Sequence, residues 1–210
     1  MKHLFFNFGE KIEGFDFKVI NERDARASAG IMFLFGLLSL FSVFILRTLL
    51  WAELFSLTFI FEFFVRVFIS PKYAPYMLLG SLFVSNQKPD WVEAKPKQFA
   101  WTLGMILGLI MTYYIVFDVL SPFRLGICLL CMLLLFLESS FGICLGCILY
   151  SKLNIKLNSC PGGVCDMPEK RVIKWRWLIL LLTVTLFSLT YVQLITNRYA
   201  EVKRVIVVEE

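Results

Sequence analysis

The stretch SAGIMFLFGLLSLFSVFIL, residues 28–46, holds no charged residue and is long enough to cross a lipid bilayer as a single helix. Lipid offers no hydrogen bonds to a polypeptide backbone, so a run of this kind is expected to be helical throughout. Four further apolar runs follow it, at residues 49–69, 99–120, 123–150 and 177–195. The sequence therefore predicts an all-α fold, a polytopic helical membrane bundle.

The composition agrees with this class. Hydrophobic residues make up 59% of the 210-residue chain, against roughly 45–50% in a soluble domain, and charged residues only 18%. Four or five spans fill a chain of this length and leave no room for a separate soluble domain. The net charge of +5 reflects Lys and Arg at the ends of the apolar runs. It therefore reports membrane topology and requires no nucleic-acid partner.

Short breaks pair the first four runs into two hairpins. Arg47 and Thr48 separate the first two runs, and Ser121-Pro122 resembles a helix N-cap followed by Pro at the first helical position. The fifth run, at residues 177–195, either spans the membrane or lies flat on it. The expected parts are an N-terminal segment, a four-helix membrane domain, a Cys-containing loop, the fifth helix and a tail, at residues 1–27, 28–150, 151–176, 177–196 and 197–210.

The loop at residues 70–98 contains four prolines and cannot be one long helix. Its apolar part, residues 76–84, is too short to span, so we expect an amphipathic segment along the membrane surface. Trp91 and Trp101 stand where interfacial anchors are expected.

Lys and Arg are unevenly distributed among the connections. Five precede the first run, four lie in residues 70–98 and six in residues 151–176, whereas each hairpin has one. The positive-inside rule then predicts a cytoplasmic N-terminus, with both loops facing the cytoplasm of a bacterial inner membrane. The N-terminal segment lacks the apolar core and cleavage site of a signal peptide, so the first span is expected to be retained.

Charged residues inside the runs are costly in lipid and normally face the bundle. Glu62 and Arg66 lie four residues apart, share a helix face and can pair; Arg66 could also pair with Glu138. Three interpretations stay open: a structural ion pair that fixes helix packing, a proton or ion relay through Glu138, and snorkelling of Glu62 and Arg66 to the interface. Asp118, before the second hairpin turn, is expected in outward-facing water.

All six cysteines fall between residues 128 and 165, in three pairs. The pairs are Cys128 with Cys131, Cys144 with Cys147, and Cys160 with Cys165. A single cysteine can be an inert packing residue. In a Cys-x-x-Cys, however, one thiolate can attack a disulfide and the other can resolve it.

The surroundings of Cys144 decide its chemistry. Ser139, Ser140 and Gly142 could break the fourth helix and place Cys144 at the start of a short new helix, which would activate its thiol; a straight helix would not. Cys131 and Cys144 would lie about 20 Å apart on a straight helix, so a relay between them would need a re-entrant helix or a mobile carrier.

The third cysteine pair suggests a rival interpretation. Pro161-Gly162-Gly163 favours a turn, which can bring Cys160 and Cys165 together. With Cys144 and Cys147 these residues supply four thiols at a spacing close to that of four-Cys zinc sites. Redox exchange and a zinc clip therefore both remain open.

Four stretches carry a family resemblance. They are VINERDAR with the following Ala29-Gly30, YAP, KPKQF and LESSFGICLGCILY, at residues 19–26, 73–75, 95–99 and 137–150. Over about residues 17–150 the chain resembles the domain of unknown function 4395 family of small bacterial integral-membrane proteins, usually with four spans. The resemblance implies no settled activity, but it implies an association with thioredoxin-like and sulfur-handling proteins. It also makes Cys144 and Cys147 the expected functional residues, with Glu138 as their companion.

The sequence thus predicts a membrane protein that exchanges disulfide or sulfane sulfur with a thioredoxin-like or sulfur-carrier partner through Cys144 and Cys147. Cys160 and Cys165 would form a second pair on the same face, and Glu138 would carry a proton. No cofactor is required. The alternative is a non-enzymatic scaffold or transport subunit with a structural zinc site; a third hypothesis is passage of a small sulfur species past Glu138. The pair Cys128 and Cys131, Cys160-Pro-Gly-Gly-Val-Cys165 and the fifth run depart from the family pattern.

Overall fold

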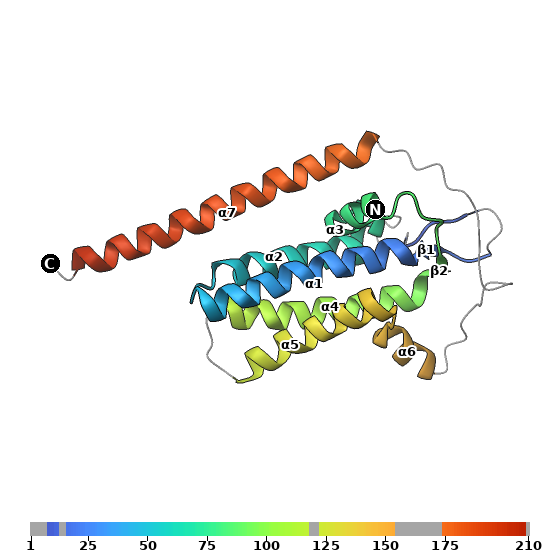
Figure 1. Cartoon of the computed structure of the whole chain (residues 1–210), viewed down its shortest axis with the longest axis horizontal. Helices are drawn as coiled ribbons and strands as arrows, with labels where there is room; N and C mark the ends of the chain where they lie inside the picture. The colour runs from blue at the N-terminus through green and yellow to red at the C-terminus, as the bar shows by residue number, and fades with distance from the viewer. Residues whose placement is uncertain (1–7, 13–15, 118–121, 154–173, 209–210) are drawn as a thin grey trace.

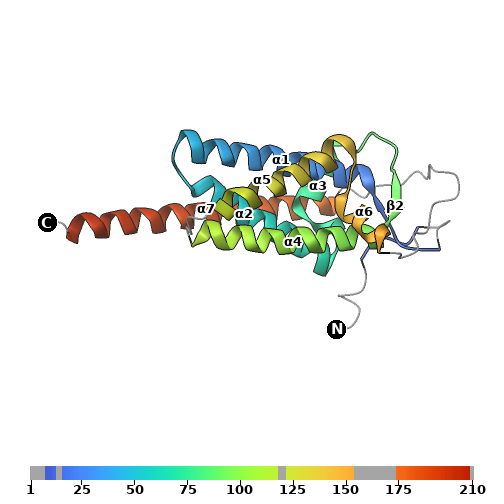
Figure 2. The same cartoon turned by 90° about the horizontal axis from the view of Figure 1, so that it is seen from below.

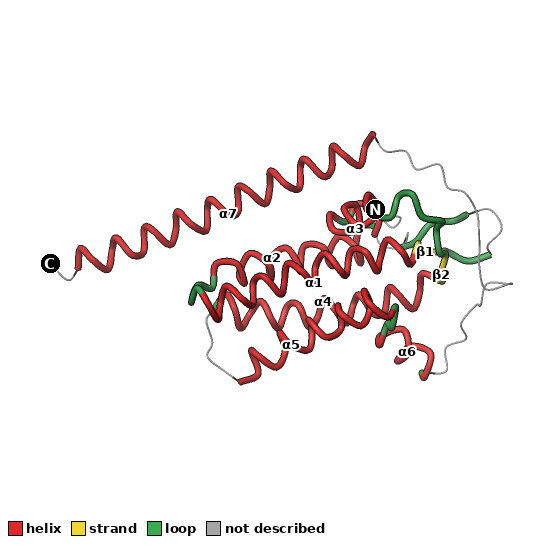
Figure 3. Tube along the Cα trace, viewed as in Figure 1, coloured by secondary structure: helices red, strands yellow, loops and turns green. Residues whose placement is uncertain are grey.

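The structure, a computed structural model, describes residues 8–12, 16–117, 122–153 and 174–208. Asp118, Ser121, Cys160 and Cys165 lie outside these residues, so the expectations placed on them stay predictions. Figure 1 shows the helices of one bundle running side by side, with the long helix α7 along one flank. Most of the described chain is helical (Figure 3).

The elements follow the apolar runs closely. The bundle helices are α1 (Glu22–Ile45), α2 (Leu50–Phe64) with a π-helical turn (Val65–Ile69), α4 (Ala94–Val116), and α5 (Pro122–Phe136) with a π-helical turn (Leu137–Phe141). A 3-10 turn (Pro71–Tyr73) and α3 (Pro75–Phe83) follow α2, and α6 (Leu145–Lys152) and α7 (Lys174–Val208) complete the helices. Two short strands, β1 (Val19–Asn21) and β2 (Trp91–Glu93), precede α1 and α4.

Among the described residues, four helical segments are long and apolar enough to cross a membrane. They are Glu22–Ile45, Ala94–Val116, Pro122–Phe141 and Trp177–Asn197. This confirms the predicted helical membrane bundle. The second predicted run is divided into the 15 residues of α2 and the five of its π-helical turn, and it lies between α1 and α4 (Figure 2).

A buried ion pair connects α1, α2 and α3. Arg66 donates through Nε to Oε1 of Glu62 at 2.8 Å, and both side chains are almost inaccessible. The Glu62 carboxylate also accepts the backbone N–H groups of Tyr76 and Met77, at 2.8 and 3.1 Å, so it caps the first turn of α3. Arg66 in turn donates to Ser28 Oγ on α1 at 3.0 Å. These contacts fit the structural interpretation of the pair, and they leave the predicted partnership of Arg66 with Glu138 wrong.

Helix α3 and two tryptophans, Trp91 and Trp101, are part of the packed core. Because Glu62 fixes its first turn, α3 packs against α1 with its residues Pro75 to Leu78 buried. Gly80 permits this approach, since a Cβ there would lie 2.7 Å from the backbone nitrogen of Ser28. Trp91 and Trp101 are 5% and 2% exposed, so they are core residues and the prediction of interfacial anchors is wrong.

The two strands set where α1 and α4 begin. They pair antiparallel, with Val19 opposite Glu93 and Asn21 opposite Trp91. The Asn21 side chain caps α1 by accepting the N–H of Arg23 at 3.2 Å, and it also accepts that of Asp90 at 3.1 Å. The first turns of α1 and α4 are thereby held next to each other, at the end of the bundle where α6 also lies (Figure 1).

Candidate functional site

The fourth predicted run is not one helix. The π-helical turn after α5 ends at Phe141, and Gly142 takes a left-handed conformation with φ 67°, which a residue with a side chain rarely adopts. Arg26 of α1 donates to the carbonyl of Ser140 at 3.3 Å, beside this glycine. Of the two alternatives for this run, the straight helix is wrong, and the break that Ser139, Ser140 and Gly142 made possible is present.

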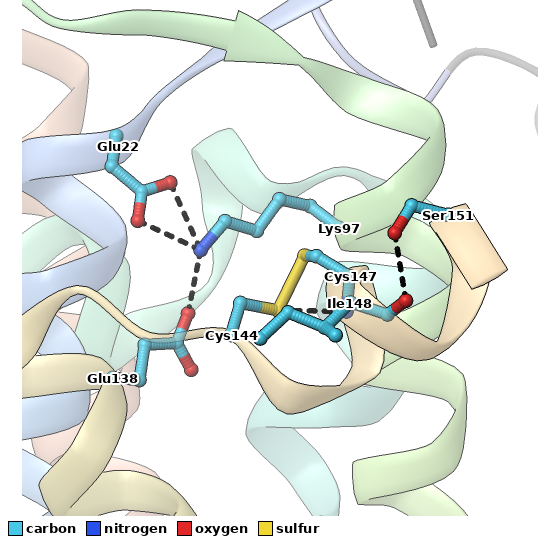
Figure 4. Close-up of a disulfide and its surroundings, with 7 residues drawn as sticks. All are labelled: Glu22, Lys97, Glu138, Cys144, Cys147, Ile148 and Ser151. Atoms are coloured by element: carbon cyan, nitrogen blue, oxygen red, sulfur yellow. Dashed lines mark hydrogen bonds and ion pairs between the residues drawn. A yellow bond between two sulfur atoms is a disulfide. The ribbon is translucent and has the colours of Figure 1, made fainter. Parts of the chain in front are cut away.

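The break places the Cys-x-x-Cys at a helix start. Cys144 is the N-cap of α6, and its Sγ accepts the backbone N–H of Cys147 at 3.3 Å. The two residues form a disulfide, with their Cα atoms 5.2 Å apart (Figure 4). A sulfur that accepts a backbone N–H at a helix start is stabilised as a thiolate when the disulfide opens.

The glycine between the two cysteines sets the position of α6. A Cβ on Gly146 would lie 2.6 Å from the Cβ of Ala100 and 2.7 Å from its Cα, so α6 and α4 touch backbone to backbone there. Only a glycine allows this approach. The disulfide is thereby held against the first half of α4.

A buried charge cluster lies next to the disulfide. Lys97 of α4 contacts Glu22 of α1 at 2.9 Å and Glu138, after α5, at 2.9 Å. The Lys97 side chain is 4% exposed and those of the two glutamates 12% and 16%. Figure 4 shows the ammonium group between the two carboxylates, and Glu138 lines the same cavity as Cys144.

The cluster does not balance in charge if all three groups are ionised. Two carboxylates face one ammonium group, so the ionised set carries one excess negative charge in a poorly solvated place. Burial of an uncompensated charge is costly. Carboxylates can act as general acids or bases, so the cluster places groups of that kind beside the disulfide.

Sequence reasoning found Glu138, Cys144 and Cys147 but missed Lys97 and Glu22. Lys97 was assigned to a surface loop, and Glu22 to the segment before the first span. A signal was present in the sequence, because three of the four stretches that carry the family resemblance each supply one member of the charge cluster. These members are Glu22 in VINERDAR, Lys97 in KPKQF and Glu138 in LESSF. The fold brings all three to one point.

Two cavities lie along α5. The inner cavity, of about 200 Å³ between α4, α5 and α6, is lined by Cys131, Glu138 and Cys144 among others. A second cavity of about 440 Å³ towards the other end of the bundle is lined by Cys128 and Cys131 and is mostly apolar. Among the described cysteines, Cys128 and Cys131 are free.

The zinc interpretation depends on residues beyond the described part of the chain, because Cys160 and Cys165 lie there. Cys144 and Cys147 are bonded to each other, and a disulfide does not supply the thiolates that zinc binds. Within residues 8–12, 16–117, 122–153 and 174–208, no group of three or more His, Cys, Asp or Glu side chains is arranged to hold a metal ion.

Comparison with known proteins adds one match. The model of the family described as domain of unknown function (DUF4395) matches residues 20–154, which contain the charge cluster, the disulfide and both cavities. No curated protein and no solved structure matches the chain.

Proposed function

Since the chain belongs to the DUF4395 family, whose description leaves the activity open, we propose from the site itself that it exchanges disulfides with a thioredoxin-like partner through Cys144 and Cys147. One observation carries the proposal: Cys144, bonded to Cys147 in a disulfide, caps α6 and lines a cavity with Glu138, which is bonded to the buried Lys97. A purely structural disulfide needs no such neighbour.

The chemistry follows from this arrangement. A thiolate of the partner attacks one sulfur of the disulfide, the Cys144–Cys147 bond breaks, and a mixed disulfide forms. With Cys147 in the mixed disulfide, the leaving thiolate is that of Cys144, which the N–H of Cys147 stabilises. The partner's second thiolate then releases Cys147, and the cluster of Glu22, Lys97 and Glu138 supplies or removes the proton that accompanies each step.

The proposal also includes the location and the second pair. With the N-terminus in the cytoplasm of a bacterial inner membrane, the end of the bundle that carries β1, β2 and α6 faces the cytoplasm, as the Lys and Arg distribution supports. Disulfides on that side of the membrane are usually transient and catalytic, which favours exchange over a structural role. Cys160 and Cys165 would pass the disulfide on from the following loop.

Exchange with a purified thioredoxin tests the proposal. The full chain is reconstituted in nanodiscs with its disulfide intact and mixed with reduced thioredoxin, and the oxidation state of both proteins is followed by alkylation and gel shift. We expect the disulfide to pass to thioredoxin in the native chain and in a Cys128→Ser/Cys131→Ser variant. We expect no transfer from Cys144→Ser or Cys147→Ser.

Two results would contradict this function. One is transfer that is as slow in the native chain as in Cys144→Ser. The other is about one tightly bound zinc per chain that disappears when Cys144, Cys147, Cys160 or Cys165 is replaced, since thiols held by zinc are not exchanging a disulfide.

A further inference from the structure

We propose that the second cavity, between α1, α2, α4 and α5, holds one acyl chain of a phospholipid with a negatively charged head group, whose phosphate pairs with Arg124. The inference goes beyond the proposed function, because it concerns the end of the bundle away from α6 and the disulfide. It depends on three features: the lining and opening of the cavity, its length and volume, and the charged side chain in its wall.

The cavity is apolar and open to lipid. Its volume is about 440 Å³, and leucine, phenylalanine, valine and methionine side chains form most of its wall. The hydroxyl of Ser39 in this wall already donates to the carbonyl of Phe35 at 2.8 Å. Phe44 of α1 and Leu125 of α5 also line the cavity and are 54% and 46% exposed, so it reaches the outer face of the bundle. A lipid chain can therefore enter it sideways from the bilayer.

The length of the cavity fits an acyl chain. Arg124 and Met132 of α5 both line it, and the eight residues between these positions rise by about 12 Å along a helix. One leaflet of a bilayer contributes about 15 Å of hydrocarbon. A chain that lies along the cavity would therefore cross most of one leaflet.

The volume of the cavity favours a chain over a helix as its occupant. A helix is about 10 Å wide with its side chains, so a 12 Å length of it would need roughly 900 Å³. The cavity offers about half of that volume. Among the described residues, α7 supplies none of the wall, since it packs against α2 and α3 on another side. A water molecule needs roughly two to four polar partners, which a wall of this kind does not provide.

Arg124 gives the site its preference for a negative head group. It lies in the first turn of α5, at the end of the bundle opposite α6 (Figure 1), and is partly exposed. Among the described residues of the wall, it alone carries a charge. Its guanidinium is a planar fork of N–H donors that matches phosphate oxygens, and the helix dipole adds to the attraction. Basic pockets between membrane helices bind anionic head groups in this way. Phospholipids surround the opening, so they are the source at hand.

Protection of Cys128 from alkylation tests the inference, because this thiol is free and lines the cavity. The full chain is purified in dodecyl maltoside without reductant, so that the Cys144–Cys147 disulfide stays closed. Modification of Cys128 by N-ethylmaleimide is followed by mass spectrometry while phosphatidylglycerol, phosphatidylcholine or oleate is added. We expect phosphatidylglycerol to protect Cys128 at the lowest concentration, and the other two to require about tenfold more.

Variants show whether the head group and the chain bind where we propose. Arg124→Gln should raise the phosphatidylglycerol concentration for half-protection about tenfold, whereas Arg124→Lys should keep part of the affinity. Arg47→Gln is the control, because Arg47 is exposed and does not line the cavity. Val43→Phe places a ring in the cavity and should abolish the lipid-dependent protection. Leu46→Phe, at an exposed position outside the cavity, should leave that protection unchanged.

Three results would overturn the inference. One is half-protection at the same phosphatidylglycerol concentration in the native chain and in Arg124→Gln, or at equal concentrations of phosphatidylglycerol and phosphatidylcholine. Another is protection by oleate at the lowest concentration, which would make a fatty acid the occupant. The third is protection that rises with protein concentration without added lipid, which would assign the cavity to a second copy of the chain. None of these measurements involves thioredoxin, so the inference and the proposed function succeed or fail separately.

Discussion

The chain contains two described Cys-x-x-Cys pairs with the same spacing and different states. Cys128 and Cys131 lie within α5 and are free, and Cys131 is 4% exposed. Cys144 and Cys147 lie at the start of α6 and form a disulfide. The difference comes from the backbone around each pair. Helix α5 continues past Cys128 and Cys131, whereas the helical segment before Cys144 ends at Gly142, and a new helix begins at Cys144. Spacing alone therefore does not define a reactive pair.

The two pairs also differ in their electrostatic surroundings. The second cavity, of about 440 Å³ beside Cys128 and Cys131, is mostly apolar. The disulfide instead stands near a lysine and two glutamates that are bonded to one another inside the protein. The helix start and the charge cluster thus both lie at the Cys144–Cys147 pair. Different residues form them, so substitutions can remove one and leave the other.

The largest effect is expected from Lys97→Met, which removes the charge that holds Glu22 and Glu138. Breaking a buried ion pair on one side leaves uncompensated charge and costs about 3 kcal/mol. We expect a clear loss of thermal stability in detergent, together with slower disulfide transfer from Cys144 and Cys147. Lys95→Met, an exposed lysine two residues earlier, is the control and should change neither.

Equal thermal stability and equal rates of disulfide transfer in Lys97→Met and Lys95→Met would show that the charge cluster does not distinguish the two cysteine pairs. Alkylation of the free cysteines Cys128 and Cys131 gives an internal reference, because its rate should not depend on Lys97.

A somewhat smaller effect is expected from adding a methyl group to Gly146, the glycine between Cys144 and Cys147. Gly146→Ala forces α6 away from Ala100, and overpacking of this kind costs about 1–3 kcal/mol. Gly126→Ala, two residues before Cys128, is the matched control, because nothing lies within 4 Å of the added Cβ. Its better helix propensity should leave α5 unchanged or slightly more stable. Thermal unfolding of both variants, with the disulfide reduced and intact, measures the difference. Equal destabilisation by the two alanines would mean that α6 does not rest on α4.

Some of these features could be predicted from the sequence and others could not. Helices 22–45, 94–116 and 122–141 follow from apolar runs, and the turn at Gly142 from local residue chemistry. The cluster of Glu22, Lys97 and Glu138 required the tertiary fold, because its members come from three distant segments and no spacing rule connects them. Counting Lys97 as a loop charge concealed it. The packing of α3 depends likewise on the Glu62 carboxylate, which caps α3 from another helix.

Alkylation rates compare the two pairs directly. After reduction, Cys144 retains the N–H of Cys147 as a hydrogen-bond donor, whereas Cys131 is enclosed by apolar side chains. We therefore expect a maleimide to modify Cys144 about tenfold faster than Cys131 at neutral pH, since thiolate content and access both favour it. Mass spectrometry of peptides from partially modified protein gives the ratio. Faster modification of Cys131 would reverse our assignment of the reactive pair.

The smallest effect is expected from Arg26→Gln, which removes the guanidinium beside Gly142. Arg26 donates to the Ser140 carbonyl at the end of the π-helical turn, at a partly exposed position, so its loss costs about 0.5 kcal/mol. Arg23→Gln, one turn earlier on α1, is the control; Arg23 donates to Gln87 and does not reach the break. If the break is what makes Cys144 a helix start, Arg26→Gln should slow disulfide transfer slightly while Arg23→Gln leaves it unchanged. Transfer at the native rate in both variants would show that Gly142 holds the turn without help from α1, and the difference between the two cysteine pairs would then rest on the glycine alone.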